Sequence, residues 1–330
     1  MSVKLKPGDV IGIISPSAPI SAFCPKRLKR GLKYLESMGY KILKGENITK
    51  VDEFTAGTIE ERVEDLHSMF ANPKVKAIIA TIGGYNANDL LDKLDYEMIS
   101  KNNKKILIGY SDVTILLHAL YKKSGVRGIM GPMILPQFAE FPKMQKFTET
   151  SFLYVTANLG TGETYKLPVS KEFTEEMLLW DKEDDRPRKM EANKGWDIIN
   201  HGEAHGILIP ANLNTMTKLI GTEYMLDLEN AILFLEDDSE ESAATIQRML
   251  QQLKQAGHLD KIKGIVFGRF QKDSDITREQ INKILSNMFG KIEFPVIANV
   301  DFGHTDPMLS LPLGNDVFVN TKERKIEIEL

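Results

Sequence analysis

Short apolar strands alternate with amphipathic helices along the first 136 residues, and this alternation limits the folds available to the chain. The run Val10–Ile14 is apolar and β-branched and leads into a proline-rich turn, as expected of a buried strand. The same pattern recurs with strands at 75–82 and 105–109 and helices at 25–38, 59–71 and 113–121. Such alternation predicts a parallel sheet with helices on both faces. We therefore predict an α/β fold with a Rossmann-like N-terminal domain over residues 1–136.

The second half of the chain predicts another α/β domain, of mixed type, over residues 206–330. Its expected strands lie at 206–209, 231–235, 262–267, 296–300 and 316–330, and its expected helices at 243–256 and 277–289. Residues 137–205 are richer in charge and proline and contain both tryptophans, Trp180 and Trp196. We interpret residues 137–205 as a linker with an inserted loop.

The composition excludes several classes of protein. Of the 330 residues, 42% are hydrophobic and 27% charged, which is typical of a globular protein and not of a disordered or fibrous one. Lys and Arg number 42 against 46 Asp and Glu, so the net charge is −4. Because a duplex-binding protein usually shows a basic excess, we expect no nucleic acid partner.

Cysteine usage and hydropathy predict a cytoplasmic protein with no membrane partner. Cys24 is the only cysteine, so no internal disulfide can form, and nothing around it favours a nucleophile. No apolar run approaches the roughly 18 residues that span a membrane. The first residues also lack the apolar stretch of a signal peptide.

A serine directly follows one of the predicted strands. Ser111 occupies the turn between the strand at 105–109 and an apolar helix. Its hydroxyl is expected near the helix N-terminus, where free N–H groups favour a developing anion. The pattern departs from the α/β-hydrolase elbow, because Val113 stands where that motif has glycine. Taken alone, a serine in this position is more often a helix cap than a nucleophile.

An acid and a histidine follow two later strands in the same way. Glu236 ends an apolar run, and the acidic residues 237–241 after it are expected to be solvated at the start of a helix, with spacing that does not fit a calcium loop. His304 lies between a glycine and a proline-containing loop, although a lone histidine is more often structural. Sites in parallel α/β sheets form at the carboxyl ends of the strands. Ser111, Glu236 and His304 together are the nucleophile, orienting acid and general base of acyl-transfer chemistry.

Paired glycines follow another strand and complete the candidate site. Gly83 and Gly84 allow a backbone N–H to approach a ligand closely, although most such pairs are simple turns. An oxyanion hole needs two such donors. The N–H of Asp112, next to the candidate nucleophile, is the natural second donor.

Metal and cofactor sites have little support in the sequence. His201 and His205 flank Glu203, but the strand that follows argues against a helix, and the order is not that of a His-Glu-x-x-His motif. No Gly-x-Gly-x-x-Gly or Walker-type loop is present, so no dinucleotide or ATP cofactor is indicated. We expect no metal and no cofactor.

Six motifs, in order along the chain, carry a resemblance to a known family. They are Pro7-Gly-Asp-x-Ile with Ser15-Pro-Ser-Ala-Pro19, Gly83-Gly-Tyr-Asn-Ala-Asn88, Gly109-Tyr-Ser-Asp112, Pro210-Ala-Asn-Leu213, Phe234-Leu-Glu-Asp237 and Gly303-His304. Together they resemble the LD-carboxypeptidase family of serine peptidases, and within it most closely the microcin C immunity-type members. The resemblance runs nearly from end to end of the chain.

The resemblance implies roles for the residues singled out above. It implies a Ser111 nucleophile with His304 as general base and Glu236 as its orienting acid. The oxyanion hole would come from the backbone at Gly84 and Asp112. Two domains with the site at their junction, no metal and a homodimer are further expectations of the resemblance.

The resemblance also implies two substrate classes. Peptidoglycan-recycling members remove the terminal D-alanine of an L,D-tetrapeptide, a muropeptide, whereas immunity-type members hydrolyse the bond between an amino acid, usually acidic, and a nucleotide. The pattern at 86–88 and the tryptophan-containing segment favour the aminoacyl-nucleotide, because a purine can stack on tryptophan. Either tryptophan could instead be a hydrophobic anchor. The substrate-binding residues expected from this branch are Gly83, Tyr85, Asn86, Asn212, Trp180 and Trp196.

Three kinds of function remain open from the sequence. The first is a serine amidase or carboxypeptidase, which the placement of three reactive residues after separate strands favours. The second is a non-catalytic two-domain protein that binds a small acyl or nucleotide ligand. The third, ranked last, is a metal hydrolase that uses His201 and His205. Arg269, after a strand, is a candidate for holding a substrate carboxylate, although a solvated surface position is more usual for arginine.

Overall fold

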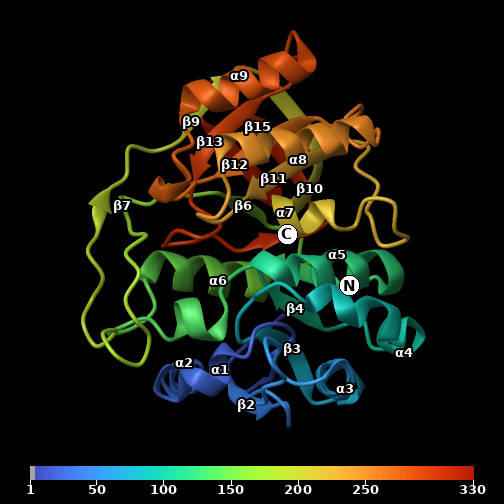
Figure 1. The fold of residues 1–330 in the computed structure, drawn as a ribbon, viewed down its shortest axis with the longest axis vertical. Coiled ribbons are helices and arrows are strands. Elements are labelled where there is room, and N and C mark those ends of the chain that lie inside the picture. The colour runs from blue at the N-terminus through green and yellow to red at the C-terminus, as the bar shows by residue number, and fades with distance from the viewer. Residues whose placement is uncertain (1–3) are drawn as a thin grey trace.

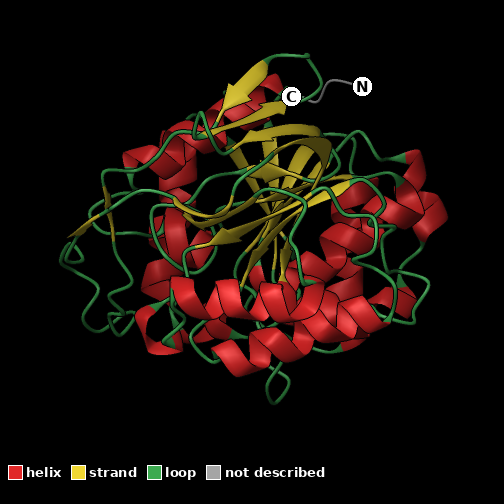
Figure 2. Cartoon of the chain, turned by 90° about the horizontal axis from the view of Figure 1, so that it is seen from above, coloured by secondary structure: helices red, strands yellow, loops and turns green. Residues whose placement is uncertain are grey.

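The computed structural model describes residues 4–330, which form two α/β domains (Figure 1). The first domain is built on a six-stranded sheet and the second on an eight-stranded sheet. Viewed from above, the strands lie in the middle of the molecule with helices around them (Figure 2). The predicted α/β class with two domains is confirmed. Within the described residues, no helix has the length and apolar character needed to cross a membrane.

The first domain alternates strands and helices as the sequence predicted. Its elements are β1 (Val10–Ile14), α1 (Ile20–Phe23), α2 (Pro25–Ser37), β2 (Lys41–Lys44), α3 (Ile59–Ala71), β3 (Val75–Ala80), η1 (Ala87–Lys93), α4 (Tyr96–Lys101), β4 (Ile106–Gly109), η2 (Ser111–Val113), α5 (Thr114–Ser124) and β5 (Arg127–Met130). The strands β2-β1-β3-β4-β5 are neighbours in that order and all parallel. In such a doubly wound sheet a crevice opens beyond the carboxyl ends of the strands where the order reverses, here at β1 and β3.

Local sequence signals explain the helix boundaries of this domain. Thr58 caps α3 in a capping box with Glu61, which satisfies free N–H groups at the helix start. Gly125 ends α5 in the left-handed conformation, which glycine adopts without strain. Most of α5 is buried, because this helix packs between the first sheet and the second domain.

The segment between the two domains is more ordered than a linker. It contains the π-helical turn η3 (Ile134–Phe138), α6 (Lys146–Asn158), β6 (Thr164–Lys166), β7 (Glu172–Phe173), β8 (Glu191–Ala192) and β9 (Asp197–Asn200). The sequence analysis did not predict α6. Strands β7 and β8 pair with each other, whereas β6 and β9 form the two edges of the second sheet. The division of the chain at residues 136 and 205 stays a prediction.

The second domain has the mixed sheet that the sequence predicted. Its elements are β10 (Glu203–Asn212), α7 (Leu213–Thr217), β11 (Ala231–Glu236), α8 (Ala243–Gln255), β12 (Gly264–Gly268), η4 (Lys272–Ser274), α9 (Arg278–Phe289), β13 (Val296–Val300), β14 (Leu311–Pro312), β15 (Asp316–Asn320) and β16 (Lys325–Glu329). The strands β10, β11, β12 and β13 are parallel, and β15 lies antiparallel to β10. The single strand expected at 316–330 is wrong: β15 and β16 form a hairpin, because the polar residues 321–324 turn the chain.

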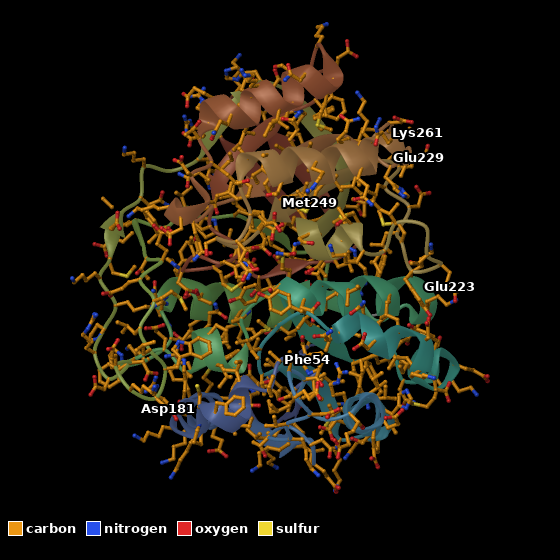
Figure 3. The ribbon with its side chains drawn as sticks, viewed as in Figure 1. Phe54, Asp181, Glu223, Glu229, Met249 and Lys261 are labelled. Atoms are coloured by element: carbon orange, nitrogen blue, oxygen red, sulfur yellow. The ribbon has the colours of Figure 1, made fainter. Side chains whose placement is uncertain are left out.

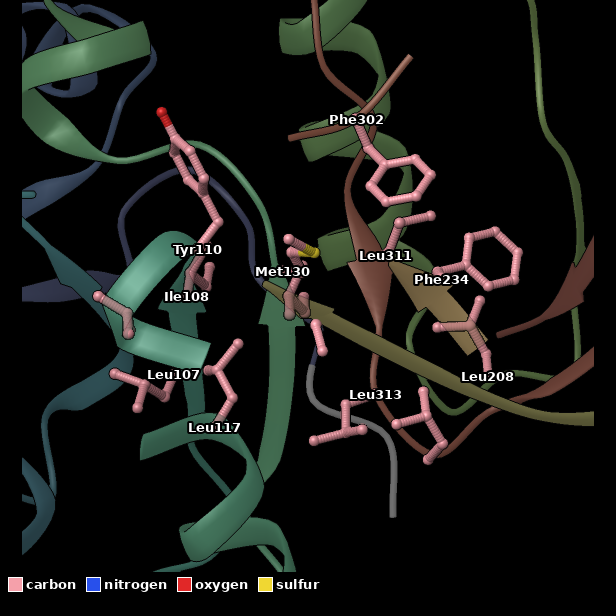
Figure 4. Close-up of a cluster of buried hydrophobic side chains, with 14 of the residues drawn as sticks. Leu107, Ile108, Tyr110, Leu117, Met130, Leu208, Phe234, Phe302, Leu311 and Leu313 are labelled. Atoms are coloured by element: carbon pink, nitrogen blue, oxygen red, sulfur yellow. The ribbon is translucent and has the colours of Figure 1, made fainter. Parts of the chain in front are cut away.

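The two domains share one hydrophobic core. Strand β14 comes from the second half of the chain but pairs antiparallel with β5 at the edge of the first sheet. Figure 4 shows the packing at this junction, with Met130 of the first sheet near Leu311 and with Phe234 and Phe302 beyond it. The domains are therefore held in one arrangement, and side chains from both can be positioned in a common site.

Candidate active site

Ser111 lies on a strained turn at the carboxyl end of β4. Its φ of 58° places a non-glycine residue in the left-handed region, which costs energy and is common at functional sites. A Cβ on Gly109 would lie 2.7 Å from Val113 Cγ1, so only glycine allows this tight passage from strand to helix. The turn holds the Ser111 side chain at the wall of a cavity of about 460 Å³.

His304 lines the same cavity from the second domain, and Glu236 lies behind it. Glu236 is the last residue of β11 and is fully buried, and His304 Nδ1 donates a hydrogen bond of 2.6 Å to Glu236 Oε2. Because Nδ1 is occupied in this way, the basic nitrogen of the neutral ring is Nε2. The Tyr110 ring packs edge-on against the His304 ring, with 5.1 Å between centroids. Across residues 4–330, no hydrogen bond joins Ser111 to His304, although both line the cavity.

The charge of Glu236 controls the ionisation of His304. Burial by itself lowers the pKa of His304, but the charge and hydrogen bond of Glu236 outweigh burial and raise the pKa above its ordinary value of 6.5. Asp237 and Asp238 act in the same direction. The arrangement therefore stabilises a protonated imidazole, as a general base requires after it has accepted a proton.

Gly83, Gly84 and Asp112 bring backbone groups next to Ser111. A Cβ on Gly83 would lie 3.0 Å from Ser111 Cβ and 3.2 Å from the Asp112 nitrogen, so this loop touches the serine turn. Gly84 has a φ of 147°, and a Cβ there would lie 2.4 Å from Ser17 Oγ. The loop is fixed by the buried Asp112 carboxylate.

The Asp112 carboxylate ties three loops together. Its Oδ2 accepts hydrogen bonds from Ser17 Oγ at 2.5 Å and from the Ala87 nitrogen at 2.8 Å. The loops that follow β1, β3 and β4 therefore meet at one carboxylate. This is the edge of the sheet at which the doubly wound topology predicts a ligand site.

Aromatic, apolar and charged side chains together line the rest of the cavity. Tyr85 and Trp180 both line it, and their binding of substrate stays a prediction. Tyr85 is 71% exposed, and its hydroxyl donates to Glu240 at 2.8 Å. The Arg27 guanidinium lies 4.3 Å from the Trp180 ring.

Comparison with known proteins decides the family. The LD-carboxypeptidase N-terminal domain matches residues 11–131, and the LD-carboxypeptidase C-terminal domain matches residues 205–319. The chain belongs to the LD-carboxypeptidase family. It is therefore an enzyme, of the serine carboxypeptidase or hydrolase type, and the predicted resemblance is confirmed.

Individual relatives cover almost the whole chain. Microcin C7 self-immunity protein MccF of Escherichia coli is 34% identical over 331 residues, covering 99% of this chain and 95% of that protein. Putative carboxypeptidase YocD of Bacillus subtilis is 37% identical over 311 residues, covering 94% and 93%. Murein tetrapeptide carboxypeptidase of Pseudomonas aeruginosa is 27% identical, covering 92% and 91%.

Solved structures agree with the fold. An MccF-like protein from Bacillus anthracis superposes with a TM-score of 0.92 at 34% identity, covering 99% of this chain and 98% of that chain. MccF in complex with aspartyl sulfamoyl adenosine gives a TM-score of 0.91 at 33% identity, covering 100% and 98%. MccF has also been solved in complex with glutamyl sulfamoyl guanosine.

Asn212 lies beside Glu236 and Asp237, outside the cavity lining. The sequence predicted it to bind substrate, but it is buried and does not line the cavity. Its amide donates to Glu236 Oε1 at 3.2 Å and to Asp237 Oδ1 at 3.0 Å, and its Oδ1 caps the start of α7. Asn212 therefore orients the carboxylate that holds His304. Burial and the charge of Glu236 raise the pKa of Asp237 to about 7.

Asn86 and Trp196 also lie outside the cavity lining. The Asn86 carbonyl accepts a hydrogen bond from the buried Arg62 at 2.9 Å, which fixes the loop after β3. Trp196 is 3% exposed and packs in the hydrophobic core. Of the two tryptophans, Trp196 is thus the hydrophobic anchor, and the prediction that it contacts substrate is corrected.

The sequence analysis missed a charged group in the cavity wall. Arg188 lines the cavity and forms ion pairs of 2.7 Å with both Glu140 and Asp306. Arg188 lies in a run of charged residues that resembles a solvated loop, so no sequence signal distinguished it. Arg269 neither holds a place in the cavity wall nor lies on the solvated surface. It is 5% exposed, pairs with Asp301 at 2.9 Å and does not line the cavity.

The structure gives no support to a histidine metal site. The His205 ring stacks on Phe318 of the neighbouring strand, with 4.4 Å between centroids. His201 lies beside Thr321, with 3.5 Å between His201 Nδ1 and the hydroxyl oxygen. In the part of the chain that the structure describes, no three His, Cys, Asp or Glu side chains form a group that could hold a metal.

Proposed function

We propose that this enzyme is a serine hydrolase with a Ser111, His304 and Glu236 triad, which cleaves the amide or acyl bond between an amino acid and a nucleotide. The observation that carries the proposal is the 2.6 Å contact of His304 with the buried Glu236 at the cavity that Ser111 lines. Acyl transfer by serine needs a base held in one tautomer by an acid, and this contact provides both.

Each group has a defined step in this mechanism. Ser111 Oγ attacks the substrate carbonyl carbon while His304 Nε2 takes the hydroxyl proton. Glu236 stabilises the imidazolium that forms, and the imidazolium then donates its proton to the leaving nitrogen or oxygen. Water repeats the sequence to release the acyl group from Ser111. The N–H groups of Gly84 and Asp112 stabilise the oxyanion, in keeping with their position beside the serine turn.

Trp180 supports a nucleotide as one half of the substrate. Its ring lines the same cavity as Ser111, and every nucleobase has a face that can stack on an indole. Ile82 and Met133 add apolar surface to the lining. The aminoacyl sulfamoyl nucleotides bound by the relative MccF have both parts of such a substrate. An acidic amino acid is the expectation carried over from this relative.

One hydrolysis assay tests the proposal against the carboxypeptidase alternative. The full-length protein would be given an aspartyl-adenylate analogue with a hydrolysable bond and, separately, an L,D-tetrapeptide, and products would be identified by mass spectrometry. Cleavage of the nucleotide conjugate by the wild type and not by Ser111→Ala supports the proposal. Cleavage of the tetrapeptide alone would identify a murein carboxypeptidase, like the Pseudomonas relative. Retained cleavage in Ser111→Ala would reject the triad.

The remaining expectations concern assembly and location. A homodimer and a cytoplasmic location stay predictions. Sedimentation of the purified protein tests the dimer directly, since a monomer at all concentrations would contradict it.

A further inference from the structure

A segment between the two domains forms one wall of the cavity. We name residues 172–192, from β7 to β8, the covering segment; on the left side of Figure 1 it runs from β7 to α2 of the first domain and returns to β8. It is anchored on α2, where the Asp181 carboxylate accepts hydrogen bonds of 2.7 Å from the nitrogens of Lys26 and Arg27. Figure 3 shows Asp181 beside this helix. An ion pair of 2.6 Å between Arg27 and Asp184 strengthens the anchor.

The same segment also touches the loop that carries His304. Thr174 and Asp306 exchange two backbone hydrogen bonds, of 2.7 and 2.9 Å. Arg188 adds a side-chain contact, with 2.7 Å from its Nη2 to Asp306 Oδ2. Asp306 lies only two residues beyond His304, so both contacts act on the backbone that positions the imidazole.

A second path leads from Asp306 to the ring of His304. The other carboxylate oxygen of Asp306 accepts a hydrogen bond of 3.2 Å from Gln137 Nε2. That amide also donates to the Tyr110 hydroxyl at 3.1 Å. Tyr110 in turn packs edge-on against His304. Asp306 is therefore connected to the imidazole both along the chain and through a neighbouring ring.

Arg188 lies between two buried acids, Asp306 and Glu140. It pairs at 2.7 Å with Asp306 and at 2.7 Å with Glu140, and the side chains of both acids are at most 10% exposed. Without the guanidinium, Glu140 would keep only its longer ion pair of 3.9 Å with Arg27, and two poorly solvated carboxylates would face each other. We expect the loop at 304–306 to shift in order to separate or hydrate them.

We propose that Arg188 is a positioning residue that couples the covering segment to His304 through Asp306. The covering segment thus supports the catalytic base in addition to forming a wall of the cavity. The inference rests on the proposed triad for its effect on activity, but the structural coupling itself does not depend on any substrate.

Three full-length variants test the coupling. Arg188→Gln removes the charge, and Arg188→Lys restores it without the planar guanidinium. Lys189→Gln is the control, because it removes one positive charge from the next residue, whose side chain is exposed. The first measurement is the rate at which a small fluorophosphonate labels Ser111, with Ser111→Ala as the blank. This probe contains neither amino acid nor nucleotide, so its rate reports on the triad and not on substrate recognition.

The second measurement needs no reaction. Proton NMR detects the Nδ1 proton of His304 in its hydrogen bond to Glu236, and solvent exchange broadens this signal when the bond opens. We expect Arg188→Gln to broaden the signal and to slow labelling on the order of 10- to 100-fold. Arg188→Lys should recover part of both effects, and Lys189→Gln should match the wild type. If Arg188→Gln does not fold, as judged by circular dichroism, Asp306→Asn takes its place.

The labelling rate and the proton signal together distinguish a failure of the coupling through Arg188 from a failure of the proposed triad. Wild-type labelling and an unchanged proton signal in Arg188→Gln would overturn the coupling, and a raised KM without either effect would make Arg188 a substrate-binding residue. If the wild type is not labelled at Ser111 but the signal still broadens in Arg188→Gln, the proposed chemistry fails and the coupling stands.

Discussion

His304 is held by Glu236 across two strand ends of the second sheet. Glu236 ends β11, His304 follows β13, and 2.6 Å separates Glu236 Oε2 from His304 Nδ1. Ser111 reaches the same cavity from the first domain. The candidate triad is thus assembled across the domain junction, and its geometry depends on the shared core between the two sheets.

Glu236→Gln should lower kcat by roughly 10³- to 10⁴-fold while the protein stays folded, because the amide no longer stabilises the imidazolium. Steady-state kinetics on the cleaved substrate and a thermal melt measure the two properties. Glu229→Gln is the matched control, since Glu229 is exposed and pairs with Lys261 (Figure 3), and neither residue lines the cavity. Equal activity of the two variants would contradict the role of Glu236.

The pH profile should carry the signature of the raised pKa of His304. A base must be unprotonated to accept the serine proton, so kcat/KM should rise with pH and level off only above the raised pKa. We expect the midpoint of this limb to lie above pH 6.5, because Glu236 raises the pKa of His304. In Glu236→Gln the residual activity should show a limb at lower pH. A midpoint below 6.5 in the wild type would contradict the assignment.

His118 should make stability depend on pH. Burial lowers its pKa to about 4, although Nε2 is hydrogen-bonded to the Pro210 carbonyl at 2.9 Å. In the unfolded chain His118 is protonated below about pH 6.5, whereas in the folded protein it stays neutral down to about pH 4. The contribution of neutral, buried His118 to the free energy of unfolding is therefore complete above pH 6.5. It is lost as the pH falls towards 4, by up to about 3 kcal/mol. Urea unfolding of the wild type and His118→Gln between pH 4 and 7.5 should show a smaller loss in the variant.

Substitution of the two tryptophans should have different effects, on ligand binding for Trp180 and on stability for Trp196. Trp180→Ala should weaken binding of a nucleotide conjugate by roughly 1–3 kcal/mol, because the ring lines the cavity. Trp196→Ala should instead lower the free energy of unfolding by about 3–5 kcal/mol, because it leaves a hole in the core. Calorimetric titration with a non-hydrolysable aminoacyl sulfamoyl nucleotide and urea unfolding measure these effects. Unchanged affinity in Trp180→Ala would contradict the role of Trp180 as a stacking surface for the nucleobase.

The three candidate triad residues could be singled out from the sequence because each lies at or shortly after the end of an apolar strand. Their catalytic roles stay a proposal. The end of an apolar run in the sequence marks the end of a strand, and parallel strands place their carboxyl ends at the same edge of the sheet. The role of Arg188 could not be predicted in the same way. Its burial depends on Glu140 and Asp306, which are distant in sequence, and a charged run offers no local sign that one member turns inward. The burial of Trp196 could not be predicted either, because the residues around a tryptophan in the sequence do not show whether its ring packs in the core or faces a ligand.

Gly303 should be required for the contact between His304 and Glu236. Its φ is 99°, and a Cβ there would lie 2.6 Å from Glu236 Oε2 and 2.8 Å from Glu236 Cβ. Gly303→Ala should therefore push the histidine loop away from the acid and reduce both stability and kcat. Gly221→Ala is the matched control, because Gly221 has a φ of 83° but nothing within 4 Å of the added carbon.

Comparing Gly303→Ala with Gly221→Ala separates the effect of the contact with Glu236 from the effect of backbone strain, because both glycines have a positive φ. Gly221→Ala should lose only about 1–2 kcal/mol of stability from the left-handed conformation, with activity unchanged. Gly303→Ala adds displacement of a catalytic group, so its kcat should fall on the order of 100-fold. Unfolding curves and kcat for the two variants provide the test. If both variants lose the same stability and both keep their activity, the close approach of Gly303 does not set the position of His304.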